Sequence, residues 1–534
     1  MKSQPHRYIA LFLALALTHS VQGQEYENIR DIGYLRATSP WMDSRNPAGL
    51  SAVTVNRTAE AEIHFQKQNG GLAGIDQSDN GIEAGALTEA YIKTSDKTTF
   101  HGKLTYSHFN GKNMGGPILM NPFYNPINFY ESSDTTTGVK KKELYHLEGG
   151  LSYKIGEKWA LGAGIDYQTG DQAKQKDPRV LNVWMDLGVS VGFRFVPSER
   201  FSVGFNLEYE RTLESIKGNI YGTTDKQYFT FIDFGGFYGS RELFDGQDGY
   251  VAVGATRPMF NSFYGASLQI EAGGKVKIFN QLTYLRRNGY YGKRSSTTVT
   301  YTEHSGNIIE YKGVFVIPGE ESLHSVGLNL RYEGLANNEN KYRMNTNLGD
   351  HTVVEYFGQN RILDRTDLHA TLSYTGYKGL DRILPELEYG FVLSADMHRS
   401  VTTIYPFYRK RSISEIHARI YGNKSISVND KNILTFGIEG LFSTGTGTPD
   451  DDGTLANSTS DTPRSADIYM NRDFEFRTGA KAGCHVKVRY TMPIRNAFTT
   501  YIEASDSYSH LLKDAEFLTS NHRNTLAITI GCTF

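Results

Sequence analysis

The chain has 534 residues, a formal net charge of −2 and a mean hydropathy of −0.44, with 34 Tyr, 29 Phe and 54 Gly against 15 Pro. The near-neutral charge argues against nucleic acid as a partner, because nucleic-acid binding depends on an excess of basic residues. Beyond its N-terminal stretch the chain contains no apolar run long enough for a transmembrane helix. Such a chain can cross a membrane only as a closed β-barrel, since every backbone polar group there needs a partner.

The N-terminus has the organisation of a secretory signal peptide. A basic region with Lys2 and Arg7 precedes an apolar stretch of about ten residues, and small residues up to Gly23 complete the pattern. The apolar stretch is too short for a membrane-spanning helix, and the expected cleavage site lacks the Cys of a lipoprotein. We therefore predict a signal peptide over 1–23, a short N-terminal periplasmic segment over 24–57 and an outer-membrane barrel over 58–534.

A long connection at 111–140 is the first distinctive element of the predicted barrel. Apolar residues and prolines are concentrated in it, which is unusual for a freely solvated loop. Either the loop folds into the barrel mouth as a constriction or lid, or it packs at the rim on its neighbours or on a partner protein. The candidate constriction residues are Ile118, Met120, Phe123, Tyr124 and Phe129.

Alternation of apolar and polar residues marks the strands that follow. In 181–195 every odd position is apolar, whereas the even positions are mostly polar or glycine, and 159–168 and 201–210 repeat this period of two. A strand with this pattern has one apolar and one polar face. A soluble β-sandwich also alternates, but many such strands with glycine on the polar side favour a barrel with an apolar outer surface.

The segment 526–534 alternates in the same way and ends at Phe534. An apolar last strand with a C-terminal Phe resembles the signal that delivers outer-membrane barrels to their assembly machinery. We therefore interpret Phe534 as an assembly signal and expect outer-membrane lipid and the barrel-assembly machinery as partners. Cys484 and Cys532 would lie on strands separated by a third strand and face outward, so we expect free thiols.

Eight tight polar turns divide the predicted barrel. With both barrel ends on the periplasmic side, eight periplasmic turns require two strands more than twice eight. The sequence therefore predicts an all-β fold, a transmembrane antiparallel up-and-down barrel of about 18 strands (range 14–20) with an aqueous interior. The turns lie near 95–97, 156–158, 197–200, 273–275, 318–321, 379–382, 429–432 and 493–497, and the polar segment 446–465 is expected to be a mobile outer loop.

The polar faces of the predicted strands should line the lumen. Acidic and basic residues are mixed on these faces, which favours a solvated wall of mutually neutralised charges. The alternative is a selectivity ladder in which the three basic residues at 485, 487 and 489 attract anions. The candidate lumen-lining residues are His101, Lys103, His146, Glu148, Asp186, Arg194, Glu208, Arg331, His417, Arg419, His485, Lys487 and Arg489.

Motifs of catalysis and cofactor binding are missing from the sequence. It has no Gly-rich phosphate loop, no H-E-x-x-H, no C-x-x-C and no G-x-S-x-G between a strand and a helix. The fifteen His are scattered along the chain. We therefore expect no enzymatic activity, no cofactor and no metal site.

Two resemblances add to this interpretation. The motif Asn-Pro-Ala-Gly-Leu at 46–50, the motif Arg-Thr-Ala-Glu at 57–60 and the Gly-rich aromatic strands after them together resemble an uncharacterised family of outer-membrane barrels from Bacteroidota. This resemblance covers most of the mature chain and implies fold and location but no activity. Separately, 46–50 is similar to the segment before the barrel in long-chain fatty-acid transporters, which have an N-terminal hatch and admit apolar solutes. Pro47 and Gly49 are equally explained by a turn before a strand.

A channel or transporter that passes small solutes across the outer membrane is the function these observations favour, and the sequence does not identify the solute. The alternative is a structural or partner-binding barrel in surface assembly, secretion or adhesion. An active TonB-dependent receptor is disfavoured, because 24–57 is too short for a plug domain.

Overall fold

The fold is described from a computed structural model. The residues that the structure describes are 31–222, 225–244, 246, 249–251, 256–348, 351–380, 384–429, 432–495 and 498–534. The signal peptide expected at 1–23 lies outside these residues. Within the described ranges, the helices are all too short or too polar to span a membrane.

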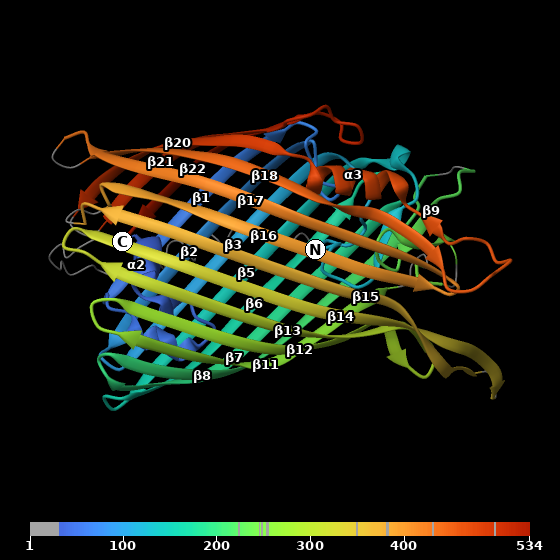
Figure 1. Cartoon of the computed structure of the whole chain (residues 1–534), viewed down its shortest axis with the longest axis horizontal. Coiled ribbons are helices and arrows are strands. Elements are labelled where there is room, and N and C mark those ends of the chain that lie inside the picture. The colour runs from blue at the N-terminus through green and yellow to red at the C-terminus, as the bar shows by residue number, and fades with distance from the viewer. Residues whose placement is uncertain are drawn as a thin grey trace, which may run out of the picture.

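Eighteen antiparallel strands form one closed barrel (Figure 1). They are β1 (Arg57–Asn69), β2 (Asn80–Ser95), β3 (Thr98–Met114), β5 (Gly138–Ile155), β6 (Trp159–Lys174), β7 (Arg179–Ser198), β8 (Phe201–Asn219), β11 (Arg257–Gly273), β12 (Lys277–Ser295), β13 (Thr298–Pro318), β14 (Ser322–Leu348), β15 (His351–Lys378), β16 (Leu387–Ile404), β17 (Phe407–Ser427), β18 (Ile433–Thr454), β20 (Lys481–Arg495), β21 (Phe498–Leu511) and β22 (His522–Thr533). Each pairs with the next barrel strand along the chain, and β22 pairs back with β1. The predicted all-β barrel of 18 strands is confirmed.

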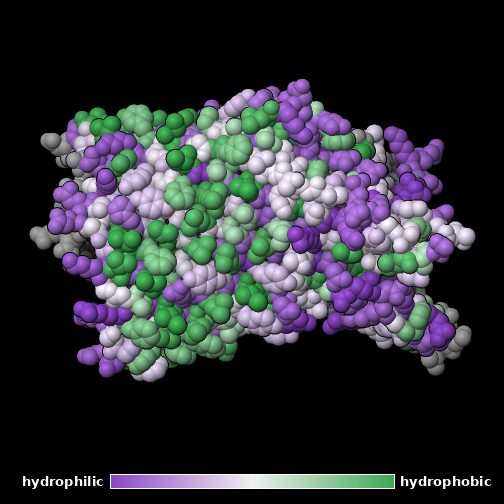
Figure 2. Space-filling view, viewed as in Figure 1, coloured by the Kyte–Doolittle hydropathy of each residue, from purple (hydrophilic) through white to green (hydrophobic). Residues whose placement is uncertain are grey.

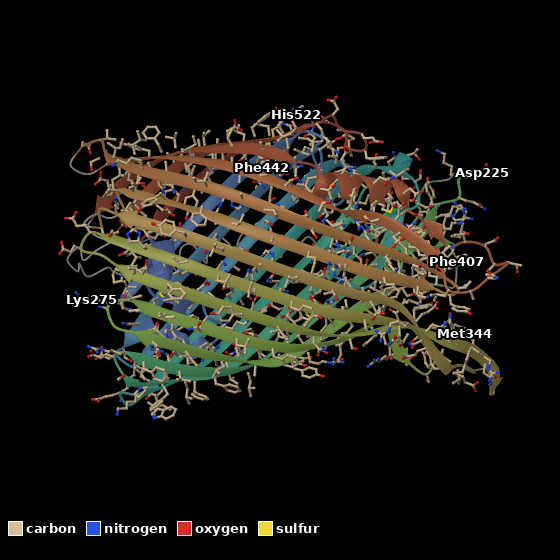
Figure 3. The ribbon with its side chains drawn as sticks, viewed as in Figure 1. Asp225, Lys275, Met344, Phe407, Phe442 and His522 are labelled. Atoms are coloured by element: carbon tan, nitrogen blue, oxygen red, sulfur yellow. The ribbon has the colours of Figure 1, made fainter. Side chains whose placement is uncertain are left out.

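The two ends of the barrel differ. β1 begins and β22 ends at the same end, here called the Phe534 end, and the strand ends that flank the eight predicted turns all lie there. Lys275, in the turn between β11 and β12, marks this end in Figure 3. Longer connections and the small helix α3 lie at the opposite end, here called the loop end (Figure 1).

An apolar belt surrounds the barrel. Large side chains such as Leu161, Val191 and Ile530 are among the most exposed apolar residues of the chain, and they lie on the outward row of their strands. Figure 2 shows hydrophobic residues gathered over the part of the barrel toward the Phe534 end and hydrophilic residues over the loop end. Because alternate side chains point to opposite faces of a strand, the apolar belt leaves the polar rows on the inside.

Several strands continue beyond the belt at the loop end. β14 has 27 residues and β15 has 28, against 12 for β22. This extension corrects the expected mobile loop at 446–465, because β18 runs to Thr454 and stays paired with β17. The Asp452 carboxylate accepts hydrogen bonds from Arg409 Nε and Nη2 at 2.6 and 2.7 Å, which holds this part of the strand in place.

A second, four-stranded sheet joins three loops at the loop end. Its order is β19 (Arg464–Ser465), β10 (Tyr238–Leu243), β9 (Phe229–Asp233) and β4 (Asn128–Glu131). The helix α3 (Asp467–Thr478) follows β19 and packs against β17 and β18. The loops therefore support one another.

Both cysteines are free thiols, as predicted. Cys484 lies on β20 and Cys532 on β22, with β21 between them.

Candidate functional site

Residues 31–56 fold inside the barrel near the Phe534 end, and we call them the internal segment. They form the helix α2 (Ile32–Thr38) and the 3-10 helices η1 (Pro40–Asp43) and η2 (Pro47–Ala52). A proline stands at the start of each 3-10 helix, where its missing N–H costs no hydrogen bond. η2 packs against β5, β6, β7 and β8. Pro47 and Gly49 therefore belong to a helix within the lumen, and not to a simple turn ahead of the first strand.

Asn46 anchors the internal segment to the wall. Its side chain is 1 % exposed, and Nδ2 donates to the carbonyl oxygen of Phe193 (2.9 Å) and to Gln269 Oε1 (3.0 Å). Oδ1 accepts a hydrogen bond from the backbone N of Ala48 (3.0 Å). The amide is thus bonded through both its donor and its acceptor, as a buried polar group must be, and it ties the segment to β7 and β11.

Wall glycines provide the space in which the internal segment sits. A Cβ added at Gly162 would lie 2.2 Å from the backbone N of Ala48, and a Cβ at Gly192 would lie 2.2 Å from Asn46 Oδ1. At Gly204 it would lie 2.8 Å from the Trp41 ring. Atoms cannot approach this closely, so any side chain at these positions would displace the segment. The glycines that the sequence places on the polar faces of β6, β7 and β8 therefore form a seat.

Ion pairs attach the internal segment to distant parts of the wall. Arg45 donates from Nη1 to Glu208 on β8 (2.8 Å) and from Nη2 to Glu310 on β13 (2.6 Å). Arg36 forms an ion pair with Glu89 on β2. Because these carboxylates lie on well-separated strands, the segment extends across the lumen.

Two cavities lie within the barrel. One of about 340 Å³ lies between the internal segment and the wall of β5 to β8, where Glu148, Asp166, Glu208 and Glu210 line it. Another of about 480 Å³ lies near α3, lined in part by Phe476 and by residues of β16 to β18 and β20. Space for solvent and small solutes therefore remains inside the barrel.

The apolar loop between β3 and β5 reaches from its own strands to other parts of the wall. The backbone N of Met120 donates to Glu214 Oε1 on β8 (2.7 Å). Arg287 on β12 donates from Nη2 to the carbonyl oxygen of Tyr124 (3.0 Å), and Arg365 on β15 also donates to carbonyl oxygens of this loop. The loop therefore folds inward at the loop end.

The candidate constriction residues have different environments. Ile118, Met120 and Phe129 are buried, Tyr124 is half-buried, and Phe123 remains 46 % exposed. Ile118 and Phe129 belong to a cluster with apolar residues of β9, the following loop and the barrel wall. The loop is thus packed on neighbouring loops and on the wall at once, and its effect on a permeating solute stays a prediction.

Buried ion pairs hold the loops in place. Lys174 on β6 donates to Glu131 on β4 at 2.5 Å, and Arg411 on β17 donates to Asp473 on α3 at 2.5 Å. All four side chains are almost fully buried. Removing one partner would leave an unpaired buried charge, which costs about 3 to 5 kcal/mol.

Asp233 on β9 is a buried carboxyl group within the loop-end sheet. Burial raises its pKa to about 6, although the backbone N–H groups of Gly235 and Tyr238 donate to it and lower the pKa. The loop-end sheet thus contains a group that titrates just below neutral pH.

The thirteen candidate lumen-lining residues lie on the strand rows opposite the apolar belt. Most have a polar partner: Lys103 Nζ lies 3.1 Å from Glu148, and Arg331 bridges Glu310 and Glu333 at 2.5 and 3.1 Å. They come from β3 (His101, Lys103), β5 (His146, Glu148), β7 (Asp186, Arg194), β8 (Glu208), β14 (Arg331), β17 (His417, Arg419) and β20 (His485, Lys487, Arg489).

The predicted basic ladder occupies one row of β20. His485 Nδ1 lies 2.6 Å from Ser507 Oγ, and the Arg489 guanidinium lies 3.4 Å from the centre of the Tyr501 ring. The Tyr501 hydroxyl in turn lies within hydrogen-bond distance of carboxylate oxygens of both Glu60 (2.9 Å) and Glu62 (2.8 Å) and can donate its proton to either. Nearby carboxylates therefore offset part of the positive charge, and the attraction of anions by this row stays a prediction.

The attachment of the internal segment to the barrel wall was not predicted from the sequence. Arg45 and Asn46 of the internal segment act through Glu310 and Gln269, which lie more than two hundred residues further along the chain. The available signal was the motif at 46–50, through its similarity to the segment before the barrel in transporters that have an N-terminal hatch.

The chain matches one protein family, and its fold is similar to solved structures of low sequence identity. A family described as "Family of unknown function (DUF6850)" matches residues 47–534. No curated protein matches the chain. Solved structures similar to it include the FrpB iron transporter from Neisseria meningitidis (7% identity, 91% of this chain and 84% of that chain, TM-score 0.39), the outer membrane transporter YddB from Escherichia coli (7%, 89% and 81%, 0.39) and BauA, the ferric preacinetobactin receptor from Acinetobacter baumannii (9%, 89% and 80%, 0.35).

Proposed function

We propose that this chain, which belongs to the DUF6850 family, is an outer-membrane barrel that passes small solutes across the outer membrane and rests in a closed state. The apolar belt around a closed sheet supports the membrane location, because hydrocarbon tolerates only closed barrels and helices. Short turns at the Phe534 end and longer loops at the other end support a periplasmic Phe534 end. The signal peptide predicted at 1–23 agrees with export.

The seating of the internal segment is the observation that carries the proposal. A barrel of 18 strands is wide enough for an aqueous interior, and here a peptide fills part of it. The segment is held by apolar contacts, among them a buried cluster of Ile32, Leu50 and Val53 with Tyr91 of β2. It is also held by hydrogen bonds and ion pairs through Asn46 and Arg45. Water can replace the polar contacts once the segment moves, so weakening these contacts should favour its release while the wall stays paired.

The apolar loop is a second barrier to solutes, in series with the internal segment. We call the internal segment and the apolar loop the two closures. It lies at the loop end, whereas the internal segment lies toward the Phe534 end, and a cavity of about 340 Å³ adjoins the segment. A solute would have to pass both. Release of one closure alone should therefore raise conductance less than release of both.

Planar-bilayer conductance of four forms tests this proposal. The forms are the wild type, Arg45→Ala with Asn46→Ala, a loop variant in which a short Gly-Ser linker replaces 117–127, and the combination of the two. We expect the lowest conductance for the wild type and the highest for the combination. The loop variant keeps Glu131, so the buried Lys174 retains its partner.

A control on the outer face is Asn524→Ala, which removes an amide that donates to Asp506 (2.7 Å) from the row of β22 that also carries the exposed Leu526 and Ile528. Its conductance should equal that of the wild type. Folding of every form is checked by heat-modifiable gel mobility. A folded combination variant that remains silent would contradict the transport proposal.

The second candidate is a partner-binding barrel, and the hairpin of β14 and β15 favours it. Figure 3 shows Met344 on the part of this hairpin that projects from the loop end. Tyr356 and Phe357 on β15 are also exposed, and exposed apolar groups on a projecting element are typical of contact sites. For this candidate, Phe357→Ser would reduce the size of the complex extracted in mild detergent, whereas Leu455→Ser, an exposed loop-end control, would not.

A further inference from the structure

His146, Glu148 and Asp166 meet on the inner wall beside the 340 Å³ cavity. His146 and Glu148 are two residues apart on β5, and Asp166 pairs with Glu148 across to β6. His146 Nε2 lies 2.8 Å from Asp166 Oδ1 and 3.3 Å from Glu148 Oε1, and the three ligand atoms all lie within 4.8 Å of one another. Strand pairing alone therefore brings together one imidazole and two carboxylates.

These distances suit a shared metal ion. Zn²⁺ binds imidazole nitrogen and carboxylate oxygen at roughly 2.0 to 2.2 Å, which places neighbouring ligand atoms roughly 3 to 3.5 Å apart. The imidazole Nε2 faces two carboxylates and can give its single proton to only one of them. A divalent ion between the three groups would bind both carboxylates and the nitrogen at once.

The surroundings favour a cation. Glu210 lies in the same cross-strand row as Asp166, with Gly188 between them, and it lines the same cavity as Glu148 and Asp166. Arg36 and Arg45 also line the cavity, but they form ion pairs with Glu89, Glu208 and Glu310. Lys103 Nζ lies 3.1 Å from Glu148 Oε1, and the second oxygen of that carboxylate can accept it when Oε1 binds a metal. Asp166 is half-exposed, so water can complete the coordination shell.

The geometry points to a binding site for one divalent transition-metal ion, with His146 Nε2, Glu148 and Asp166 as ligands and water in the remaining positions. The imidazole distinguishes it from Ca²⁺ and Mg²⁺ sites, which use oxygen ligands. This inference departs from the expectation of no metal site, which rested on the absence of ligand spacing within any single segment. It goes beyond solute passage and does not depend on an open lumen.

Isothermal titration of the detergent-purified full chain with Zn²⁺ tests the site. We expect about one Zn²⁺ per chain, with Mg²⁺ unable to compete. His146→Ala should abolish saturable binding, and Asp166→Asn should raise the Kd at least about tenfold. Co²⁺ provides a second readout, since its visible absorption should appear in the wild type and vanish in His146→Ala.

The matched control is His417→Ala. His417 also lies on the inner wall between two carboxylates, but its Nε2 is 3.7 Å from Asp396 and 3.9 Å from Glu415. This variant should bind Zn²⁺ like the wild type. Absence of binding in the folded wild type, or binding that survives in His146→Ala, would overturn the inference. Zn²⁺ binding by a barrel that does not conduct would contradict the proposed function and leave the metal site standing.

Discussion

The main chains of Phe534 and Ala59 exchange two hydrogen bonds, from Ala59 N to Phe534 O (2.7 Å) and from Phe534 N to Ala59 O (2.9 Å). They continue the pairing of β22 with β1 and so complete the closure of the barrel at the Phe534 end. The Phe534 ring stacks on Phe498, with 6.3 Å between ring centres, and lies under the Arg57 guanidinium at 5.4 Å. The ring thereby connects β1, β21 and β22.

Replacing this ring should impair assembly. Phe534→Ala keeps the two backbone hydrogen bonds but removes the contacts with Phe498 and Arg57, so we expect a several-fold lower yield of folded barrel in membranes. Thr533→Ala, which loses a hydroxyl contact with Thr499, should reduce the yield far less. Heat-modifiable mobility of isolated membranes measures both. Equal yields would remove the assembly role of Phe534.

Gly162→Ala should release the internal segment without disturbing the strands. The added methyl group would overlap the backbone of Ala48, and overpacking of this kind costs about 1 to 3 kcal/mol. Acrylamide quenching of Trp41 fluorescence, with Trp159 and Trp184 replaced by Phe, should increase. Gly102→Ala is the matched control, because a Cβ there meets open space. Quenching that stays at the wild-type level would contradict the seat formed by the glycines.

The loop-end sheet should weaken as the pH rises through the acidic range. The pKa of Asp233 is raised from 3.8 to about 6 by burial, so the folded sheet holds the proton more tightly than the open chain does. Its stabilising effect is complete below about pH 4 and is lost by about pH 6 to 7. The loss amounts to about 3 kcal/mol, from about 1.4 kcal/mol per pKa unit.

Hydrogen exchange of the β9 and β10 amides, corrected for the intrinsic pH dependence, measures this change. Protection should fall between pH 4 and pH 7 in the wild type. Asp233→Asn, which keeps an oxygen acceptor for Gly235 and Tyr238 but cannot ionise, should show a flat profile. Protection that rises over this range would have the wrong sign.

Cysteine labelling should show the orientation of the barrel. In a background where Cys484 and Cys532 are replaced by Ser, a Cys introduced at Asp451 should react with a membrane-impermeant maleimide on intact cells. A Cys at Ser198, the last residue of β7 at the Phe534 end, should react only after the outer membrane is permeabilised. The reverse pattern would invert the proposed orientation.

The barrel could be predicted because its determinants are local. An outward apolar row and an inward polar row appear in any single strand, such as β7 with Leu181 and Val191 on one row and Asp186 on the other. The turns are equally local. Each depends on a few polar residues between two alternating segments, so their number determined the strand count.

The closures depend on contacts that sequence periodicity does not encode. Asn46 meets Gln269 across 223 positions, and neither residue is unusual within its own segment. At 446–465 the Asp-rich composition suggested a mobile loop, whereas Arg409 on the neighbouring strand binds Asp452 and keeps β18 paired. The apolar loop was recognisable from its composition, but Phe123, which stays exposed, shows that composition does not fix each side chain.

The position of the internal segment also imposes an order on biogenesis. Asn46 forms its hydrogen bonds with the backbone of Phe193 on β7 and with the side chain of Gln269 on β11, and Arg45 forms an ion pair with Glu310 on β13. These partners are synthesised long after the segment itself. The segment can therefore bind in its final position only after most of the wall has paired. A barrel whose assembly stops before β13 would lack the carboxylate that pairs with Arg45.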